Sequence, residues 1–105
     1  KAARLRSEIA AQQVQELQRS RAAELARTRA QWQQLQESLA YHEGSGAALA
    51  VALRHDAARA YLNGEAGYVE FLQGMEQART IEEERLGVRY RTALTLIHLN
   101  ALMGL

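Results

Sequence analysis

Glycine and proline are both absent from about Ala2 to His42, and proline is absent from all 105 residues. Ala, Leu, Glu, Gln and Arg dominate the composition, with alanine at twenty positions, and all five residue types favour helices. The β-branched and aromatic residues that strands prefer are few. The sequence therefore predicts an all-α fold, and its length allows one domain at most.

The larger apolar residues of this first segment follow helical spacing and form a narrow stripe. They are Leu5, Ile9, Val14, Leu17, Leu25, Trp32, Leu35 and Leu39. Eight of the ten glutamines lie between Gln12 and Gln36, so most of the surface is polar. This pattern predicts a long, coiled-coil-like helix that packs along one seam and faces water elsewhere.

Two glycine clusters interrupt the helical pattern. Residues 43–46 read Glu-Gly-Ser-Gly and predict that the helix is broken near Gly44–Gly46, by a natural bend or by an engineered linker. Residues 63–67 read Asn-Gly-Glu-Ala-Gly and predict a turn near Gly64–Gly67. The expected elements are a long helix at 1–42, a second helical segment at 47–62 and a return helix at 68–103.

These lengths leave two arrangements open. A reversal at Gly64 gives a long antiparallel hairpin, in which the first twenty or so residues have no partner in the chain. A reversal at the first glycine cluster gives a three-helix bundle instead. On the return helix the expected apolar stripe comprises Tyr68, Phe71, Leu72, Met75 and Ala78, followed by Leu86, Tyr90, Ala93, Leu94 and Ile97. The chain begins inside a helical pattern without Met, so we expect a fragment of a longer protein whose copies associate.

No catalytic constellation is present, and no cofactor motif. The net charge of +1 is too balanced for a nucleic-acid surface, and the absence of cysteine excludes disulfides, zinc ribbons and thiol catalysis. No stretch is long and apolar enough for a transmembrane helix. The histidines lack helical metal-ligand spacing, so we expect no metal. A weaker alternative is a metal-binding helical protein that uses His42, Glu43, His55 and Asp56.

The turn and its flanks carry the most information. Tyr61 and Gly64 form a Tyr-x-x-Gly pattern, and residues 64–73 read Gly-Glu-Ala-Gly-Tyr-Val-Glu-Phe-Leu-Gln. Ala93, Leu96, Leu99 and Gly104 follow toward the C-terminus. Over roughly residues 30–105 these features resemble the C-terminal helical hairpin of the TolC-like outer-membrane efflux family. They are most similar to its heavy-metal branch (CusC/CzcC type) and to the TolC-like C-terminal extension of CzcA-type RND pumps.

The chain also departs from the family pattern at two places. The region around Tyr41 is not followed by the family's proline, and Ala47 lies near its place. Ala66 leaves the turn without the basic residue that some members carry. The first departure leaves open the geometry of the glycine break, and the second concerns a salt bridge at the tip of the hairpin.

The resemblance implies a non-catalytic periplasmic hairpin in a tripartite RND-type efflux system that exports heavy-metal cations. Its expected partners are further copies of the chain, as a trimer in the intact family or a dimer as a fragment, together with a periplasmic adaptor and the RND pump. The tip positions that would dock them are Tyr61, Asn63, Gly64, Glu65, Tyr68 and Glu70. The expected location is the periplasmic side of a cell-envelope protein. The alternative is a generic coiled-coil or helical-bundle oligomerisation domain.

Overall fold

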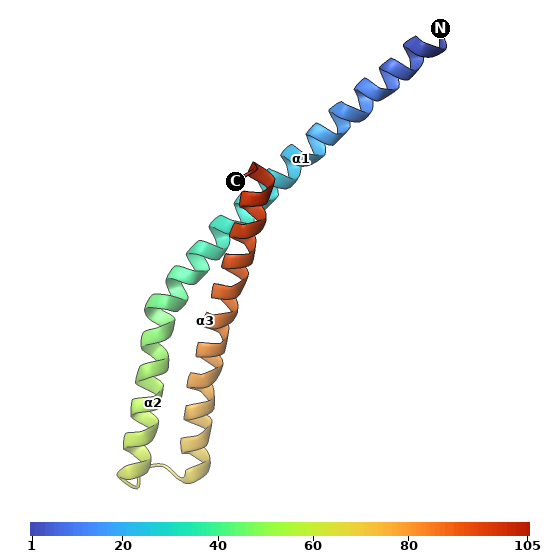
Figure 1. The fold of residues 1–105 in the computed structure, drawn as a ribbon. Helices are drawn as coiled ribbons and strands as arrows, with labels where there is room; N and C mark the ends of the chain where they lie inside the picture. The colour runs from blue at the N-terminus through green and yellow to red at the C-terminus, as the bar shows by residue number, and fades with distance from the viewer.

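The computed structural model describes residues 1–105 and is entirely helical apart from one turn and the chain ends. In chain order the elements are α1 (Ala2–Tyr41), the π-helical segment η1 (His42–Gly46), α2 (Ala47–Leu62) and α3 (Tyr68–Met103). The all-α prediction and the helical hairpin are confirmed: α3 runs back along α2 and the second half of α1 (Figure 1). The molecule measures 90 × 22 × 16 Å. None of its helices combines the length and the hydrophobicity needed to cross a membrane.

The structure differs from the sequence expectation at Gly44–Gly46, where the helix continues without a break. His42 and Gly46 both keep right-handed helical dihedral angles, and the segment forms a single π-helical turn between α1 and α2. Two helical glycines cost about 2 kcal/mol, but here tertiary contacts oppose that cost. Gly46 is buried, and Glu43 accepts a hydrogen bond from Nε of Arg89 on α3 at 2.7 Å. Because the chain does not reverse here, the three-helix bundle does not form.

The chain reverses direction at residues 63–67, between α2 and α3. Gly64 has φ +75°, a left-handed conformation that favours glycine. The Gly64 N–H donates to the carbonyl of Tyr61 at 3.1 Å, and the Glu65 N–H donates to that of Ala60 at 2.9 Å. This pair of bonds is a Schellman motif, which satisfies the last carbonyls of α2 and ends the helix.

A narrow seam joins the two arms of the hairpin. Ten of the fourteen buried and half-buried residues on α3 recur at steps of three and four, in a coiled-coil heptad. They are Phe71, Gly74, Ala78, Ile81, Arg85, Val88, Thr92, Thr95, Leu99 and Leu102; the other four are Met75, Glu82, Gly87 and Asn100. Only six residues of the chain are buried: Thr28, Gly46, Ala50, Ala78, Val88 and Leu99. The seam is therefore thin, as the narrow stripe of α1 predicts.

The expected stripe on α3 is mostly wrong. Only Phe71, Met75 and Ala78 of its residues are buried or half-buried, whereas Tyr68, Leu72 and its entire second half are exposed. Leu86, Tyr90, Leu94 and Ile97 are exposed by 47% to 65%. Along this stretch Arg85, Val88 and Thr92 take the inner face of α3 instead, and the larger residues form a second, outward-facing stripe. The two helices approach closely nearer the turn, where a Cβ atom placed on Gly74 would lie only 2.8 Å from Cβ of Ala57 on α2.

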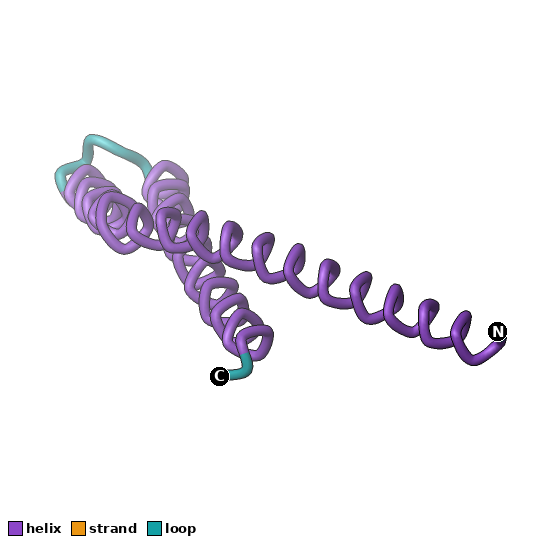
Figure 2. The backbone as a smooth tube through the Cα atoms, turned by 90° about the horizontal axis from the view of Figure 1, so that it is seen from above, coloured by secondary structure: helices purple, strands orange, loops and turns teal.

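The first part of α1 extends beyond the hairpin without a partner (Figures 1 and 2). The last contacts between α1 and α3 join Glu24 to His98 at 3.2 Å and Arg29 to Met103 at 3.6 Å. Residues 1–23 are all exposed, including Leu5 and Leu17. At 1.5 Å per residue this overhang is about 35 Å long.

Candidate functional site

The structure brings all six expected tip residues to one end of the molecule; the N-terminus lies at the other end, and the C-terminus lies beside α1 at the open end of the hairpin (Figure 1). They come from the last turn of α2, the connecting turn and the first turn of α3: Tyr61, Asn63, Gly64, Glu65, Tyr68 and Glu70. All six are exposed. The tip is therefore an exposed surface formed by α2, the turn and α3, which a partner could contact, and it is not a pocket.

Three aromatic rings pack against one another at the tip. The rings of Tyr61 and Phe71 are stacked, with centroids 5.0 Å apart and planes at 25°. Tyr68 lies 6.1 Å from Tyr61 and 6.5 Å from Phe71. Such pairs each stabilise by about 0.5–1.5 kcal/mol beyond their buried area. Phe71 was not among the expected tip residues, although its position one helical turn after Tyr68 places both rings on one face.

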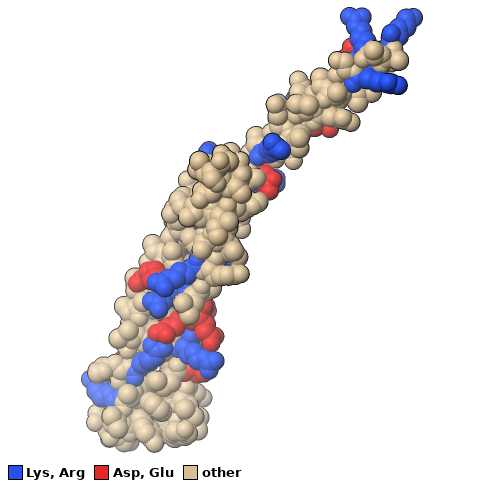
Figure 3. All heavy atoms as spheres, in the orientation of Figure 1, with Lys and Arg blue, Asp and Glu red and all other residues tan.

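The surface of the tip is largely apolar. Leu62 is 82% exposed and Val69 66% exposed, and the ring of Tyr68 is exposed as well. Neither Glu65 nor Glu70 takes part in an ion pair, and Figure 3 shows few charged side chains at this end of the molecule. Glu70 lies in the first turn of α3, where a carboxylate interacts favourably with the helix dipole. The tip therefore offers an apolar contact surface with two free carboxylates.

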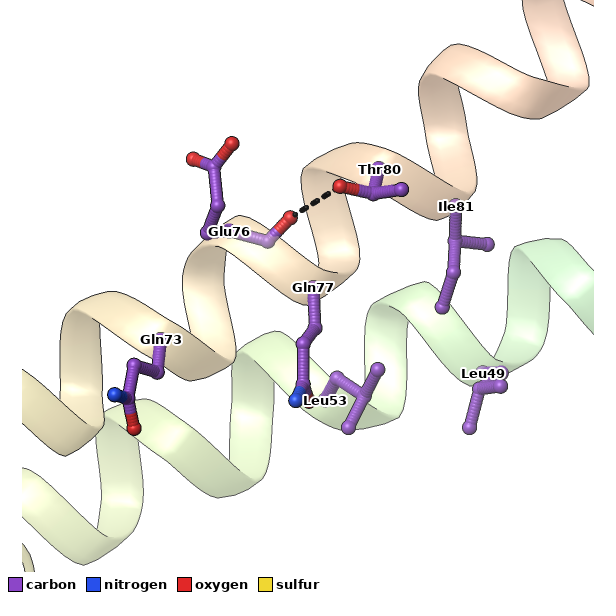
Figure 4. A pocket seen from close by; sticks show the side chains of 7 residues that line it. All are labelled: Leu49, Leu53, Gln73, Glu76, Gln77, Thr80 and Ile81. Carbon is purple, nitrogen blue, oxygen red and sulfur yellow. Dashed lines mark hydrogen bonds between the residues drawn. The ribbon is translucent and has the colours of Figure 1, made fainter.

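An open groove of about 670 Å³ runs between α2 and α3 above the tip (Figure 4). Leu49, Leu53 and Ile81 contribute its apolar side chains. Polar residues of α3 complete its lining: Gln73, Glu76, Gln77 and Thr80. Thr80 is held by a hydrogen bond from its hydroxyl to the carbonyl of Glu76 at 3.1 Å. An apolar groove with a polar wall suits a helix or an extended segment of a partner, and the groove contains no cluster of catalytic side chains.

Ion pairs hold the two arms together above the groove. Arg54 on α2 pairs with Glu82 on α3, and this hydrogen bond lowers the pKa of Glu82 and raises the pKa of Arg54. Within α3 Glu82 lies three residues before Arg85, which also lowers its pKa, so the sequence alone did not single out Arg54 as its partner. Glu43 on η1 lies 2.7 Å from Arg89 and 3.7 Å from Arg85. The ion pairs therefore fix the register of α3 against both α2 and the π-helical segment.

Three buried polar atoms on the seam have no hydrogen-bond partner within the chain. They are Nε1 of Trp32, Nδ1 of His42 and Nε of Arg85. Leaving a buried polar group unsatisfied costs about 1–3 kcal/mol. His42 lies on η1, and Arg85 pairs with Glu43 of the same segment. The polar part of the seam is therefore concentrated at the π-helical segment.

The structure does not assemble a metal site. No group of three or more histidine and carboxylate side chains is close enough to hold an ion. His42 and Glu43 lie on η1, whereas His55 and Asp56 lie thirteen residues further along the same continuous helix, about 20 Å away. His98 pairs with Glu24 instead. The four residues of the metal-binding alternative are therefore not brought together.

Comparison of the chain with protein-family models, with curated proteins and with solved structures finds no match. The function is therefore inferred from the geometry of the hairpin and from its exposed surfaces.

Proposed function

We propose that the chain is a non-catalytic helical hairpin that forms part of the wall of a larger helical assembly. The observation that best supports this proposal is that nineteen large hydrophobic residues are exposed, whereas only six residues of any kind are buried. An isolated hairpin with so thin a core gains little from burial. Covering the exposed side chains with further helices would supply the stabilisation that the chain lacks alone.

The more specific proposal is a periplasmic hairpin in a TolC-like channel component of a tripartite RND-type efflux system that exports heavy-metal cations. Three features support it: the Tyr-x-x-Gly turn at Tyr61–Gly64, the 90 Å length of the molecule, and the largely apolar surface of the tip. In this role the tip contacts a periplasmic adaptor or the pump, and other exposed apolar side chains, such as Leu5 and Leu17 on α1, contact neighbouring hairpins. The chain itself needs no cofactor and need not bind the exported cation.

The experiment measures metal tolerance of the parent cell with variants of the full-length protein. Tyr68→Ser and Glu70→Lys change the tip, whereas Val51→Ser changes a residue of similar exposure on α2, away from the tip. We expect the two tip variants to lower growth in copper, silver, zinc or cobalt salts, and the control to leave it unchanged. Unchanged metal tolerance after deletion of the gene would refute the efflux function.

A generic coiled-coil oligomerisation domain is the second candidate, and the regular heptad along α3 favours it. The two proposals differ at the turn. A generic bundle needs Gly64 only for its left-handed conformation, so Gly64→Ala should lower stability and leave assembly intact. If the tip docks a partner, Gly64→Ala should also weaken that contact. Metal tolerance of cells that carry this variant would then fall.

A further inference from the structure

The second stripe of α3 is an uncharged apolar surface that nothing in the chain covers. We define the outer stripe as Leu86, Tyr90, Leu94 and Ile97, which are 54%, 65%, 47% and 65% exposed. Their spacing of four, four and three residues places them on one face of the helix. Arg85, Arg89 and Arg91, the nearest cations in the sequence, lie roughly 100° or more around the helix from the centre of this face. Glu83 lies on the same face one turn before Leu86 and is paired with Arg79 at 3.0 Å.

The chain exposes far more surface than a compact protein of its size. Its accessible surface is 8124 Å², whereas a compact monomer of this mass of 11.7 kDa exposes about 5,900 Å². Part of this excess of about 2,200 Å² belongs to the overhang at residues 1–23, and the rest includes the uncovered outer face of α3. A stable dimer of ordinary size buries roughly 800 Å² on each partner, and a second copy can bind this face without disturbing the seam of the hairpin.

The outer stripe is complementary to itself when two copies run antiparallel. Leu86 then faces Ile97 of the other copy and Tyr90 faces its Leu94, because both pairs are centred on nearly the same point, close to Thr92. A two-fold axis at this point repeats every contact, as in the isologous interfaces of most homodimers. The large side chains of one helix then lie opposite large side chains of the other along the whole stripe.

The charge distribution also favours the antiparallel arrangement. Lys1, Arg4 and Arg6 gather at the free end of the overhang, where Figure 3 shows a cluster of cations. A parallel dimer would bring two such clusters together. The antiparallel dimer places them at opposite ends of the assembly, several tens of Å apart, where solvent and salt screen their repulsion.

From these observations we propose that two copies of this chain form an antiparallel dimer through the outer stripe, with the two-fold axis near Thr92. The dimer is a property of the outer stripe and does not depend on the efflux function. Its test is the association of the purified 105-residue chain in solution.

Sedimentation equilibrium over a range of concentrations measures this association directly. We expect a dimer that Ile97→Glu weakens at least about tenfold, because each dimer contains the Ile97 contact twice and a buried unpaired carboxylate is costly. Val51→Glu is the matched control, since Val51 is 64% exposed on α2 and lies outside the outer stripe. Far-UV circular dichroism establishes that both variants keep their helix content. A monomer, a trimer, or equal effects of the two variants would overturn the proposal.

Cross-linking distinguishes the antiparallel dimer from a parallel one. The chain has no cysteine, so single cysteines can be introduced at opposite ends of the outer stripe, as Leu86→Cys and Ile97→Cys. After oxidation of an equimolar mixture we expect disulfides between the two different variants. A predominance of disulfides within each variant would show parallel helices and contradict the antiparallel arrangement.

Discussion

The close approach of α2 and α3 at Gly74 makes a quantitative prediction about packing. A Cβ atom at Gly74 would lie 2.8 Å from Cβ of Ala57 and 3.9 Å from its Cα. Carbon atoms in good contact are about 3.5–4.0 Å apart. The Ala57 methyl group is fixed to the backbone and cannot rotate away, so the Gly74→Ala variant must push the two helices apart by about 1 Å.

Gly87 provides the matched control, because it also lies inside α3 but a Cβ atom placed on it would have no neighbour within 4 Å. Replacing a helical glycine with alanine stabilises a helix by about 0.5–1 kcal/mol, and this gain is common to both variants. Overpacking at Gly74 costs about 1–3 kcal/mol. We therefore expect Gly74→Ala to be about 1–3 kcal/mol less stable than Gly87→Ala.

Urea unfolding, followed by circular dichroism at one protein concentration, measures the difference in the free energy of unfolding. The double variant Gly74→Ala with Ala57→Gly moves the methyl group from one helix to the other and should return stability close to that of the original chain. Two results would contradict this reasoning: Gly74→Ala raising the free energy of unfolding as much as Gly87→Ala does, or the double variant being no more stable than Gly74→Ala alone. In either case the close approach does not control the packing.

Three further predictions concern the polar contacts and the turn. The hydrogen bond from its arginine partner on α2 lowers the pKa of Glu82. The pair therefore stabilises the fold fully above about pH 4.3, the ordinary pKa of Glu. This stabilisation is lost as the pH falls through the lowered pKa. Thermal unfolding should therefore depend less on pH below that value in Glu82→Gln. Glu43→Gln should lower the free energy of unfolding by about 1 kcal/mol, because η1 loses its ion pairs to α3, whereas Glu65→Gln, which breaks no ion pair, should not. Gly64→Ala should cost about 1–2 kcal/mol in urea unfolding, since alanine is strained at positive φ, and Gly67→Ala should be nearly neutral at φ −79°.

The sequence predicted the helices and the hairpin because those features depend on local properties. Helix formers without proline specify long helices, and the Asn63–Gly64 pair supplies the left-handed residue that lets the chain turn. The six tip residues follow from the same turn, since residues on either side of a tight reversal must lie together. Local preference is therefore sufficient for the outline of the molecule.

The packed face of α3 could not be predicted in the same way. Size and hydrophobicity favoured Leu86, Tyr90 and Ile97, but the seam beyond the expected Ala78 contains Arg85, Val88 and Thr92, because the packed face depends on how the two arms lie against each other. Cross-hairpin ion pairs such as Arg54–Glu82 also depend on the register of the two arms, which no single helix specifies. Both failures concern the relation between two helices and not the formation of either one.

The π-helical segment also depends on how the two arms pack against each other, and it leads to a final prediction. Thr28, Leu35 and His42 follow one another on the seam at intervals of seven residues, but Ala50 comes eight residues after His42 and Ala57 seven after Ala50. The stretch around η1 thus holds one residue more than the heptad allows. A π turn absorbs such an extra residue, so α2 continues to face α3 beyond it.

Deleting one residue inside η1 should therefore make the helix more regular and preserve the hairpin. Without Ser45 the interval from His42 to Ala50 becomes seven, and an ordinary α-helix keeps the whole seam in line. Deleting Ala52, an exposed residue of α2, is the control: it turns everything that follows by about 100° and moves Ala57 off the seam. We expect the Ser45 deletion to unfold at the original temperature or above and the Ala52 deletion to unfold well below it. Equal destabilisation by the two deletions would mean that η1 is held by its own contacts, such as Glu43 with Arg89, and not by the phase of the seam.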